Sequence, residues 1–331
     1  MPTTIDTTQT TILKRAAIRA SLAPSVHNTQ PWQLVLTASS LEIRADWTRQ
    51  LHVLDPSKRQ LLISCGCALF NVRVVLAADG YDAVTERFPD PAQPDLIARV
   101  SLPESRSEWL PIGALDPMID RRQTNRRRFE NAERVSAESL SAFVSAANAE
   151  DAELFVIQEP EHRVVTASLS QRADAIQNTD PAYRAEIRAW TTADPQRRDG
   201  VPAMAVPHVD AGAGDEVPIR DFDTHGMGWL PTRTESSSHQ CLLLLGTRSD
   251  DPTSWVRAGE ALERIWLEAT ARNYVASPLT QVVEIPATRE RLRAELNLPM
   301  HPHMLLRVGR AATTPTSRRR PLEDVLVERD L

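Results

Sequence analysis

Two stretches of this sequence repeat each other, and the repeat limits the possible folds more than any other feature. Gly66-Cys67-Ala68-Leu69 is followed, fourteen residues after Gly66, by Gly80-Tyr81. Gly259-Glu260-Ala261-Leu262 is followed at the same spacing by Asn273-Tyr274. Both stretches have the apolar periodicity of a long, buried-face helix. The chain is therefore expected to contain two equivalent long helices, one in each half.

The elements around these helices repeat in the same order. The first half predicts a helix at about 10–22, strands at 33–37 and 41–45 that form a hairpin, and strands at 81–86 and 96–102. The second half predicts helices at about 137–147, 161–177, 181–191 and 287–297, and strands at 153–158, 241–245, near 274 and at 304–308. Each long helix follows an Asp-Pro pair, so Pro56 and Pro252 are expected at the first helical position. A duplicated α+β unit explains the shared order, and chance combined with common helix-forming patterns is the alternative.

The composition changes along the chain suggest where the halves divide. Residues 103–118 carry three prolines and no clear periodicity, which places a boundary there. We expect an N-terminal half at 1–110 and a C-terminal half at 111–331. Residues 192–240 are rich in Pro, Gly, Asp and Ser. A loop of that length is either disordered or functional, and here it is a candidate lid over a site.

Several classes of protein are disfavoured by composition. No stretch approaches the ~18–20 unbroken apolar residues of a membrane-spanning helix, and residues 1–11 lack the pattern of a signal peptide. Three cysteines make no disulfide framework, so a cytoplasmic protein is expected. A net charge of −6 gives no general attraction to nucleic acid or anionic membranes. No GxSxG, HExxH or Walker motif is present, and we expect no metal site.

Arginine is the one unusual feature of the composition. Of 38 basic residues only Lys14 and Lys58 are lysines, a bias that a GC-rich genome also explains. Five arginines fall within residues 121–128, and three more are consecutive at 318–320. Because a guanidinium can grip a phosphate or carboxylate with two hydrogen bonds, these two clusters are candidate anion-binding segments.

A second candidate segment is 23–32, Ala-Pro-Ser-Val-His-Asn-Thr-Gln-Pro-Trp. It joins a helix end to a strand through two prolines, which restrict the backbone. Ser, His, Asn and Gln side chains follow one another within six residues. Such a segment is either a turn whose polar groups bond to nearby backbone or a rigid polar edge that faces a planar, hydrogen-bonding ligand.

These segments resemble motifs of the nitroreductase superfamily. Residues 23–32 are similar to its flavin-binding segment, and 122–126 resembles its Arg-x-Ser-x-Arg phosphate motif with Thr124 in place of serine. Residues 259–280 look like its long dimer-core helix and the loop at the flavin N5, and 318–325 resembles its closing basic-Pro segment. The resemblance covers nearly the whole chain except about 192–240. It is nearest to the Acg-like branch, in which two nitroreductase units are fused.

The resemblance implies an α+β fold of tandem fused units, with mixed, mainly antiparallel sheets flanked by helices, forming an intramolecular pseudo-dimer. The family is typically a homodimer with two flavins at the interface, each bound by both subunits. Here the first half has the flavin-edge segment, but too few residues precede Pro24 to supply a phosphate motif. The second half has the phosphate motif, but reads Ser-Ala-Ala-Asn-Ala-Glu at 145–150, where its own edge should fall. One FMN per chain is therefore expected, and the other pseudo-symmetric site should be vestigial.

The motif positions imply which residues bind FMN. Arg122, Thr124, Arg126 and Arg319 are expected to hold the phosphate, and Arg126 also favours negative charge near N1 and O2. A backbone N–H of Leu279 or Thr280 is expected to orient N5. Arg127 and Arg128 are expected on the solvated surface. The complete set of predicted cofactor-binding residues is Pro24, Ser25, Asn28, Gln30, Arg122, Thr124, Arg126, Pro278, Leu279, Thr280 and Arg319.

The implied function is that of an FMN-dependent oxidoreductase of the nitroreductase type. Such an enzyme passes two electrons from NADPH or NADH through the flavin N5 to a flat acceptor such as a nitroaromatic or a quinone. The cofactor carries the chemistry, which agrees with the lack of a recognisable catalytic acid or base. The alternative is an FMN-sequestering or redox-sensing flavoprotein whose site is closed by residues 192–240. Fused halves also predict a monomer. A third alternative, a fused dimer that has lost its flavin, conflicts with the intact phosphate motif.

Overall fold

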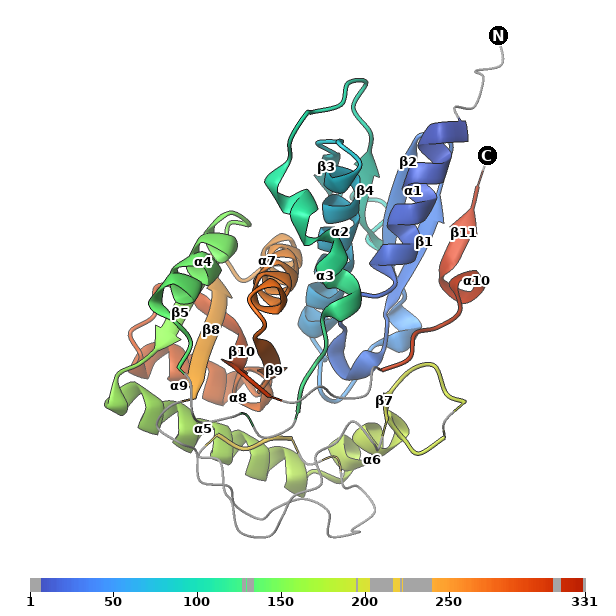
Figure 1. The fold of residues 1–331 in the computed structure, drawn as a ribbon. Coiled ribbons are helices and arrows are strands. Elements are labelled where there is room, and N and C mark those ends of the chain that lie inside the picture. The colour runs from blue at the N-terminus through green and yellow to red at the C-terminus, as the bar shows by residue number, and fades with distance from the viewer. Residues whose placement is uncertain are drawn as a thin grey trace.

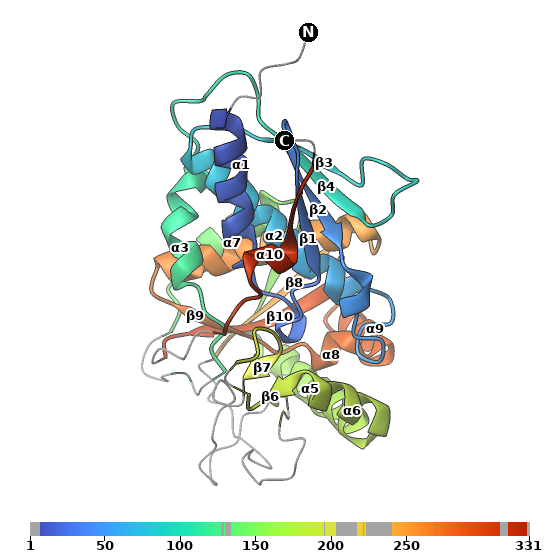
Figure 2. The ribbon, with the colours of Figure 1, turned by 90° about the vertical axis from the view of Figure 1, so that its right-hand side faces the viewer.

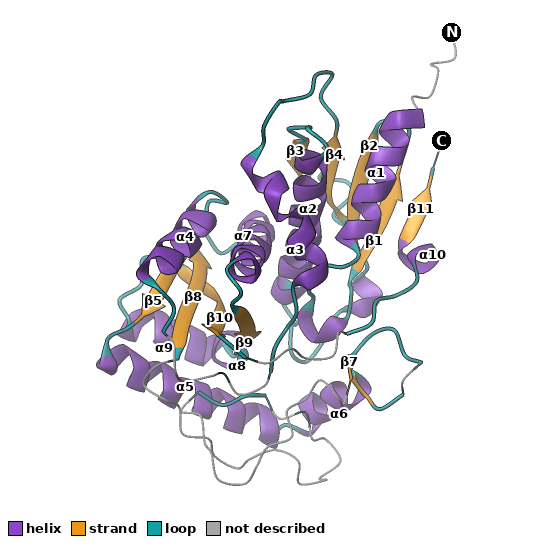
Figure 3. Ribbon diagram, viewed as in Figure 1, coloured by secondary structure: helices purple, strands orange, loops and turns teal. Residues whose placement is uncertain are grey.

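The computed structural model describes residues 7–126, 129, 134–194, 196–202, 217–220, 222, 240–311 and 317–329. Figure 1 shows two sheets on opposite sides of a central pair of helices, α2 (Arg59–Ala78) and α7 (Pro252–Ala271). These are the two long helices that the sequence predicts. They pack directly on each other, and Figure 3 shows the strands on either side of them.

The first sheet has the strand order β11-β1-β2-β4-β3. Its strands are β1 (Trp32–Leu36), β2 (Ser40–Ala45), β3 (Val84–Arg87), β4 (Leu96–Ser101) and β11 (Leu326–Glu328). All pairs are antiparallel except β1 with β11, which is parallel. The accompanying helices are α1 (Thr7–Ala20), α3 (Asp116–Arg121), α10 (Leu322–Val325) and the short 3-10 turns η1 (Val26–Asn28), η2 (Trp47–Arg49) and η3 (Pro111–Leu115).

The second sheet has the order β5-β8-β10-β9 and is antiparallel throughout. Its strands are β5 (Glu153–Ile157), β8 (Cys241–Thr247), β9 (Val275–Pro278) and β10 (His301–Gly309). The helices of this half are α4 (Ala137–Asn148), α5 (Pro160–Thr179), α6 (Pro181–Ala189), α8 (Gln281–Glu284) and α9 (Pro286–Glu295). A separate parallel pair, β6 (Thr191–Thr192) and β7 (Val201–Pro202), lies near α6. These boundaries confirm the helices and strands expected from the sequence to within a few residues.

The start of α2 differs from the prediction. Pro56 is not its first helical residue, because the helix begins at Arg59 after Lys58, whose φ of 68° is left-handed. Asp55 nevertheless caps the helix, since its carboxylate accepts a hydrogen bond from the Leu61 N–H at 2.9 Å. Pro252 does occupy the first turn of α7, and Asp251 accepts from the Ser254 N–H at 2.8 Å. The same Asp-Pro pair thus begins one helix directly and the other after an extra turn.

The repeat in the sequence corresponds to a repeat in three dimensions. The order β1-β2-β4-β3 in one sheet matches β5-β8-β10-β9 in the other. Both long helices end in a left-handed residue, Gly80 (φ 84°) and Asn273 (φ 59°). In each case the N–H of the following tyrosine bonds back to the last turn at 2.8 Å, Tyr81 to Leu76 O and Tyr274 to Ala269 O.

The two helices approach closely where the repeated glycines meet. A Cβ on Gly259 would lie 2.0 Å from the Ile63 carbonyl oxygen, and a Cβ on Gly66 would lie 2.1 Å from that of Val256. Only glycine allows this crossing distance. Among the described residues α2 alone is long and apolar enough to span a membrane, but 89% of its most apolar window is buried inside the protein. This burial is that of a core helix.

The C-terminal tail returns to the first half of the chain. Residues 317–320 lie beside η1, where the Asn28 amide donates to the Arg318 carbonyl, and β11 then pairs with β1, with Leu326 opposite Leu34. Figure 2 shows this last strand beside the first sheet. The tail therefore connects the last residues of the chain to the segment that the sequence marks as a polar edge.

Candidate functional site

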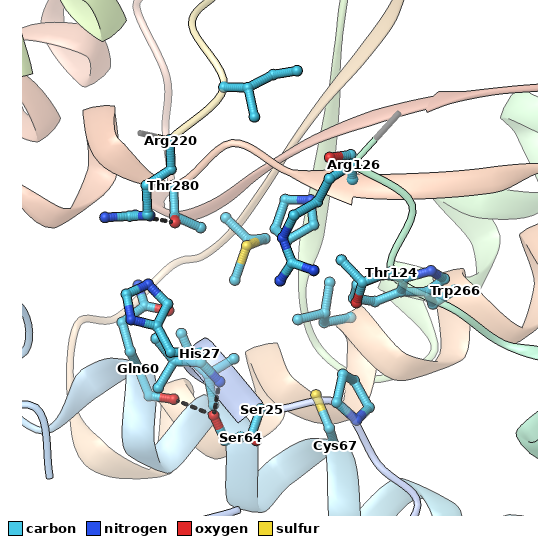
Figure 4. A pocket seen from close by; sticks show the side chains of 18 of the residues that line it. Ser25, His27, Gln60, Ser64, Cys67, Thr124, Arg126, Arg220, Trp266 and Thr280 are labelled. Carbon is cyan, nitrogen blue, oxygen red and sulfur yellow. Dashed lines mark hydrogen bonds between the residues drawn. The ribbon is translucent and has the colours of Figure 1, made fainter. Parts of the chain in front are cut away.

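A hollow lies between the two halves of the chain. The first half supplies the loop before η1 and one face of α2, and the second supplies α7, β9 and the chain after α3. Figure 4 shows these side chains converging on the space. Its walls are Pro24, Ser25, Val26, His27, Gln60, Ile63, Ser64, Cys67, Thr124, Arg126, Ile219, Arg220, Phe222, Leu262, Trp266, Ser277, Pro278, Thr280 and Met304.

A second hollow adjoins the first, since Thr124 lines both. Its other walls are Leu22, Ile119, Asp120, Arg122, Gln123, Ser317 and Arg319. The first hollow has many apolar and aromatic walls, and the second contains the buried Arg122 and the partly buried Arg319. Together they fit a ligand with a flat ring system at one end and an anionic group at the other.

The segment 122–126 reaches both hollows because it is extended. Thr124 forms a parallel bridge with Ala276 of β9, and the Asn125 N–H donates to the Ala276 carbonyl at 3.0 Å. Residues two apart in an extended segment project to the same side. This local geometry explains why Arg122, Thr124 and Arg126 all line the cavity, as the motif predicts.

Arg122 and Arg319 form the cationic end. Both donate to the Leu22 carbonyl, at 3.3 Å and 3.0 Å. Arg319 also donates to Asn28 Oδ1 at 3.0 Å, and Arg122 lies over the Trp266 ring at 5.1 Å. Within the described part of the chain, Nε and Nη1 of Arg122 and Nε of Arg319 are buried and make no hydrogen bond, although a carboxylate oxygen of Glu263 lies 3.3 Å from Arg122 Nε. Buried cationic donors without acceptors are costly, so this end is built to receive an anion.

The electrostatics agree with that inference. Burial, together with the nearby charge of Arg122, lowers the pKa of Arg319 to about 9. Burial and the charge of Arg220 lower the pKa of Arg126 to about 10. For each guanidinium, burial and a neighbouring positive charge both disfavour the charged form, and a bound anion would offset both effects.

His27 occupies a conspicuous place in the first hollow. Its φ of 46° is left-handed, and its ring meets the Phe222 ring edge-on at 5.6 Å. Both ring nitrogens are buried and without a hydrogen-bond partner among the described residues. Burial, with the charges of Arg220 and Arg126, holds the pKa of His27 well below its usual value. The imidazole is therefore neutral and can donate or accept one hydrogen bond to a ligand.

Asn28 and Gln30 are outside the lining of both hollows. The Asn28 amide donates to the carbonyls of Gly200 and Arg318, both at 3.1 Å. Gln30 donates to the Arg198 carbonyl at 3.0 Å and accepts from the Arg320 N–H at 2.8 Å. These two side chains hold the C-terminal tail and the residues around 200, and Asn28 orients Arg319 directly.

The residues of the predicted N5 loop are also divided between the cavity and the protein core. Pro278 and Thr280 line the first hollow, whereas Leu279 is buried in the second sheet's core. The Leu279 N–H donates to the Leu305 carbonyl at 2.8 Å. It is engaged in that hydrogen bond, which leaves Thr280 as the residue of this pair at the cavity.

Several lining residues carried no motif. Gln60, Ser64 and Cys67 lie on α2 and Trp266 lies on α7, and no sequence motif marked them as site residues. Arg220 lies in the candidate lid, where its guanidinium pairs with both Glu284 oxygens at 2.6 Å and 2.7 Å and donates to Thr280 Oγ1 at 3.0 Å. Ile219 and Phe222 complete this wall. Most of the rest of 192–240, together with Arg127 and Arg128, lies outside the described residues.

Comparisons with known proteins agree with the motifs. Residues 119–310 match the model of the nitroreductase family. "Putative NAD(P)H nitroreductase Rv3131" of Mycobacterium tuberculosis is 33% identical over 92% of this chain and 88% of its own. "Putative NAD(P)H nitroreductase acg" of the same organism is 30% identical over 98% of this chain and 97% of its own. A solved nitroreductase with bound FMN from Desulfitobacterium hafniense is 16% identical over 63% of this chain and 95% of its own, with a TM-score of 0.39.

Proposed function

The chain belongs to the nitroreductase family, and from this premise we propose that it is an FMN-dependent oxidoreductase. It would take two electrons from a reduced nicotinamide and pass them to a flat acceptor such as a nitroaromatic or a quinone. The observation that carries the proposal is the pair Arg122 and Arg319, whose guanidiniums, among the described residues, keep buried N–H groups that make no hydrogen bond, next to the first hollow.

The residues present fit FMN. Arg122, Thr124 and Arg319 would hold the phosphate by charge-assisted hydrogen bonds. Pro24, Ser25, Pro278 and Thr280 would line the ring system, with Arg126 beside it. Asn28 and Gln30 would act indirectly, because they hold the C-terminal tail that carries Arg319. Leu279 would support the loop from the core of the second sheet.

Bound FMN supplies a ring that accepts and returns two electrons, and the protein determines access and electrostatics. Arg126 is a partly buried cation at the first hollow, and its charge would favour an electron-rich ring. The neutral His27 offers a hydrogen bond to a ligand, and the apolar side chains of Ile219, Phe222 and Met304 exclude water. Donor and acceptor would use the same face in turn, since each must stack on the ring.

A second candidate is an FMN-sequestering or redox-sensing protein with little turnover. It is favoured by the wall formed by Ile219, Arg220 and Phe222, which occupies one side of the hollow. The buried ion pair between Arg220 and Glu284 fixes that wall in place. A fixed wall would restrict the space in which a nicotinamide can stack.

The matching strand orders of the two sheets support a further part of the proposal. We infer that the chain is a fused pair of nitroreductase units, divided near residue 110, with one FMN at their internal interface. An internal pseudo-dimer needs no second copy, so a monomer is expected.

An anaerobic visible spectrum of the purified protein tests the proposal. A flavin band that NADPH bleaches supports the oxidoreductase. A band that persists with NADPH but bleaches with dithionite favours sequestration. If no flavin band develops even after incubation with FMN, both functions are wrong.

A further inference from the structure

Glu263 is a buried carboxylate beside the cationic end of the cavity. It lies on α7 and is fully buried, with Oε1 3.3 Å from Arg122 Nε. Within the described residues neither carboxylate oxygen makes a hydrogen bond of ordinary geometry. Among the described residues, Glu263 is therefore the carboxylate that pairs with Arg122, and it leaves other Arg122 N–H groups without a hydrogen bond.

The duplicated helix shows that this carboxylate is not needed for the helix crossing. Counting from the repeated glycines, Glu263 corresponds to Phe70 on α2, which is also fully buried. The carboxylate is present only on the helix that faces the phosphate motif. Its neighbour Glu260 is equally buried but fully paired, with Arg73 at 2.7 Å and Arg87 at 2.7 Å and 2.8 Å. A structural role explains Glu260 but leaves Glu263 unexplained.

Charge balance points to a role for Glu263. A phosphate monoester carries close to two negative charges at neutral pH, and Arg122 and Arg319 supply two positive ones. An ionised Glu263 would leave the loaded site with an excess negative charge in a buried setting, whereas a protonated Glu263 leaves it neutral. We propose that binding of the FMN phosphate to Arg122 and Arg319 is coupled to uptake of one proton from solvent by the Glu263 carboxylate. This inference rests on the proposed function.

The surroundings of Glu263 allow its carboxylate to take up a proton from solvent near neutral pH. Burial raises the pKa of Glu263 to about 7, against the opposing charges of Arg122 and Arg319. On α2, the Asn71 amide faces it, and the Cys67 thiol is neutral because burial and Glu263 raise its pKa. Asp120 of α3 lines the same hollow, but it is exposed and paired with Arg19.

The sign of the effect follows from linkage. Above about pH 7 the empty site holds an ionised Glu263 that competes with phosphate for Arg122. FMN affinity should then fall as pH rises, because each binding event must recover a proton. A phosphate adds its own titration only below that range, since its second pKa is about 6.

FMN and riboflavin titrations between about pH 7 and 8, below the pKa of Arg319, test the proposal. Flavin fluorescence gives Kd, and calorimetry in two buffers of different ionisation enthalpy gives proton uptake. For the wild type, the Kd for FMN should rise by up to about tenfold per pH unit, with uptake approaching about one proton. Riboflavin lacks the phosphate and should show neither effect. Glu263→Gln should remove both effects for FMN in this range and bind it more tightly than the wild type at pH 8.

Matched variants separate this role from a structural one. Glu263→Asp keeps a titrating group and should keep the proton uptake. Glu260→Gln removes a buried charge from the same helix and should leave the pH profile unchanged. Proton uptake that persists in Glu263→Gln between pH 7 and 8 overturns the proposal, as does a wild-type FMN affinity that is flat over that range. The wild-type comparison of FMN with riboflavin stands even if a variant does not fold. Absence of FMN binding at every pH would instead refute the proposed function.

Discussion

Neighbouring arginines in this chain have different physical roles. Arg121 is exposed and donates to Asn273 at 3.2 Å. Arg122 is 5% exposed and has buried N–H groups without acceptors in the described part of the molecule. The first gains little from its charge because water screens it. The buried Arg122 is not screened by water, so its charge and its N–H groups can bind strongly to an anion that enters the cavity.

This contrast gives a prediction for Arg122→Ala. The variant should bind FMN about 10- to 100-fold more weakly, because hydrogen bonds to a charged group contribute about 1.5–3 kcal/mol. Flavin retained after ultrafiltration measures the effect. Arg121→Ala is the matched control and should keep the wild-type affinity. Full retention of flavin by Arg122→Ala would show that the phosphate lies elsewhere.

The sequence located the site better than it assigned the individual contacts. Motif spacing singled out Arg122, Thr124, Arg126, Pro24 and Ser25, and the structure places all five in the cavity lining, the three from 122–126 because that segment is extended. It did not show that Asn28 and Gln30 turn to the tail, since their partners lie about 170 and 290 residues away. Arg220 and Glu263 carried no local signal, because only tertiary packing brings them to the cavity.

At the scale of helices, the same local pattern can have two outcomes. Both Asp-Pro pairs predict a helix start, yet α2 begins three residues after its proline and α7 begins at its proline. The helix ends are better determined, because Gly80 and Asn273 both tolerate the left-handed conformation that closes a helix. The periodicity predicted the two helices, and the crossing of their glycines becomes evident only from the packing.

Gly259→Ala should destabilise the protein through this crossing. The added Cβ would meet backbone, 2.0 Å from the Ile63 carbonyl oxygen and 2.8 Å from Gly66 Cα, so the helices must separate. Overpacking of this kind costs about 1–3 kcal/mol in the free energy of unfolding. Urea denaturation measures it. Thr253→Ala, on the exposed first turn of α7, should change stability by less than about 0.5 kcal/mol. Equal stability of Gly259→Ala and wild type would mean that the helices cross at a greater distance.

At the scale of the whole molecule, the C-terminal tail joins the halves. Its Arg319 completes the cationic end, its backbone holds Asn28 and Gln30, and β11 covers the edge of β1. A three-residue strand paired in parallel with a strand almost 300 residues earlier has no local signature. The sequence indicated a basic segment near the flavin, but the strand that anchors it could not be predicted.

Truncation before Ser317 should therefore have two separable effects. FMN affinity should fall at least about tenfold, because Arg319 is lost and Asn28 has no tail to hold. The bared edge of β1 should also pair with other chains, so the truncated protein should self-associate while the full chain remains monomeric. Flavin stoichiometry and sedimentation velocity measure the two effects. Arg319→Ala keeps β11, so it should lose flavin without self-association. A truncated chain that holds FMN as tightly as the full protein would show that the tail is not part of the site.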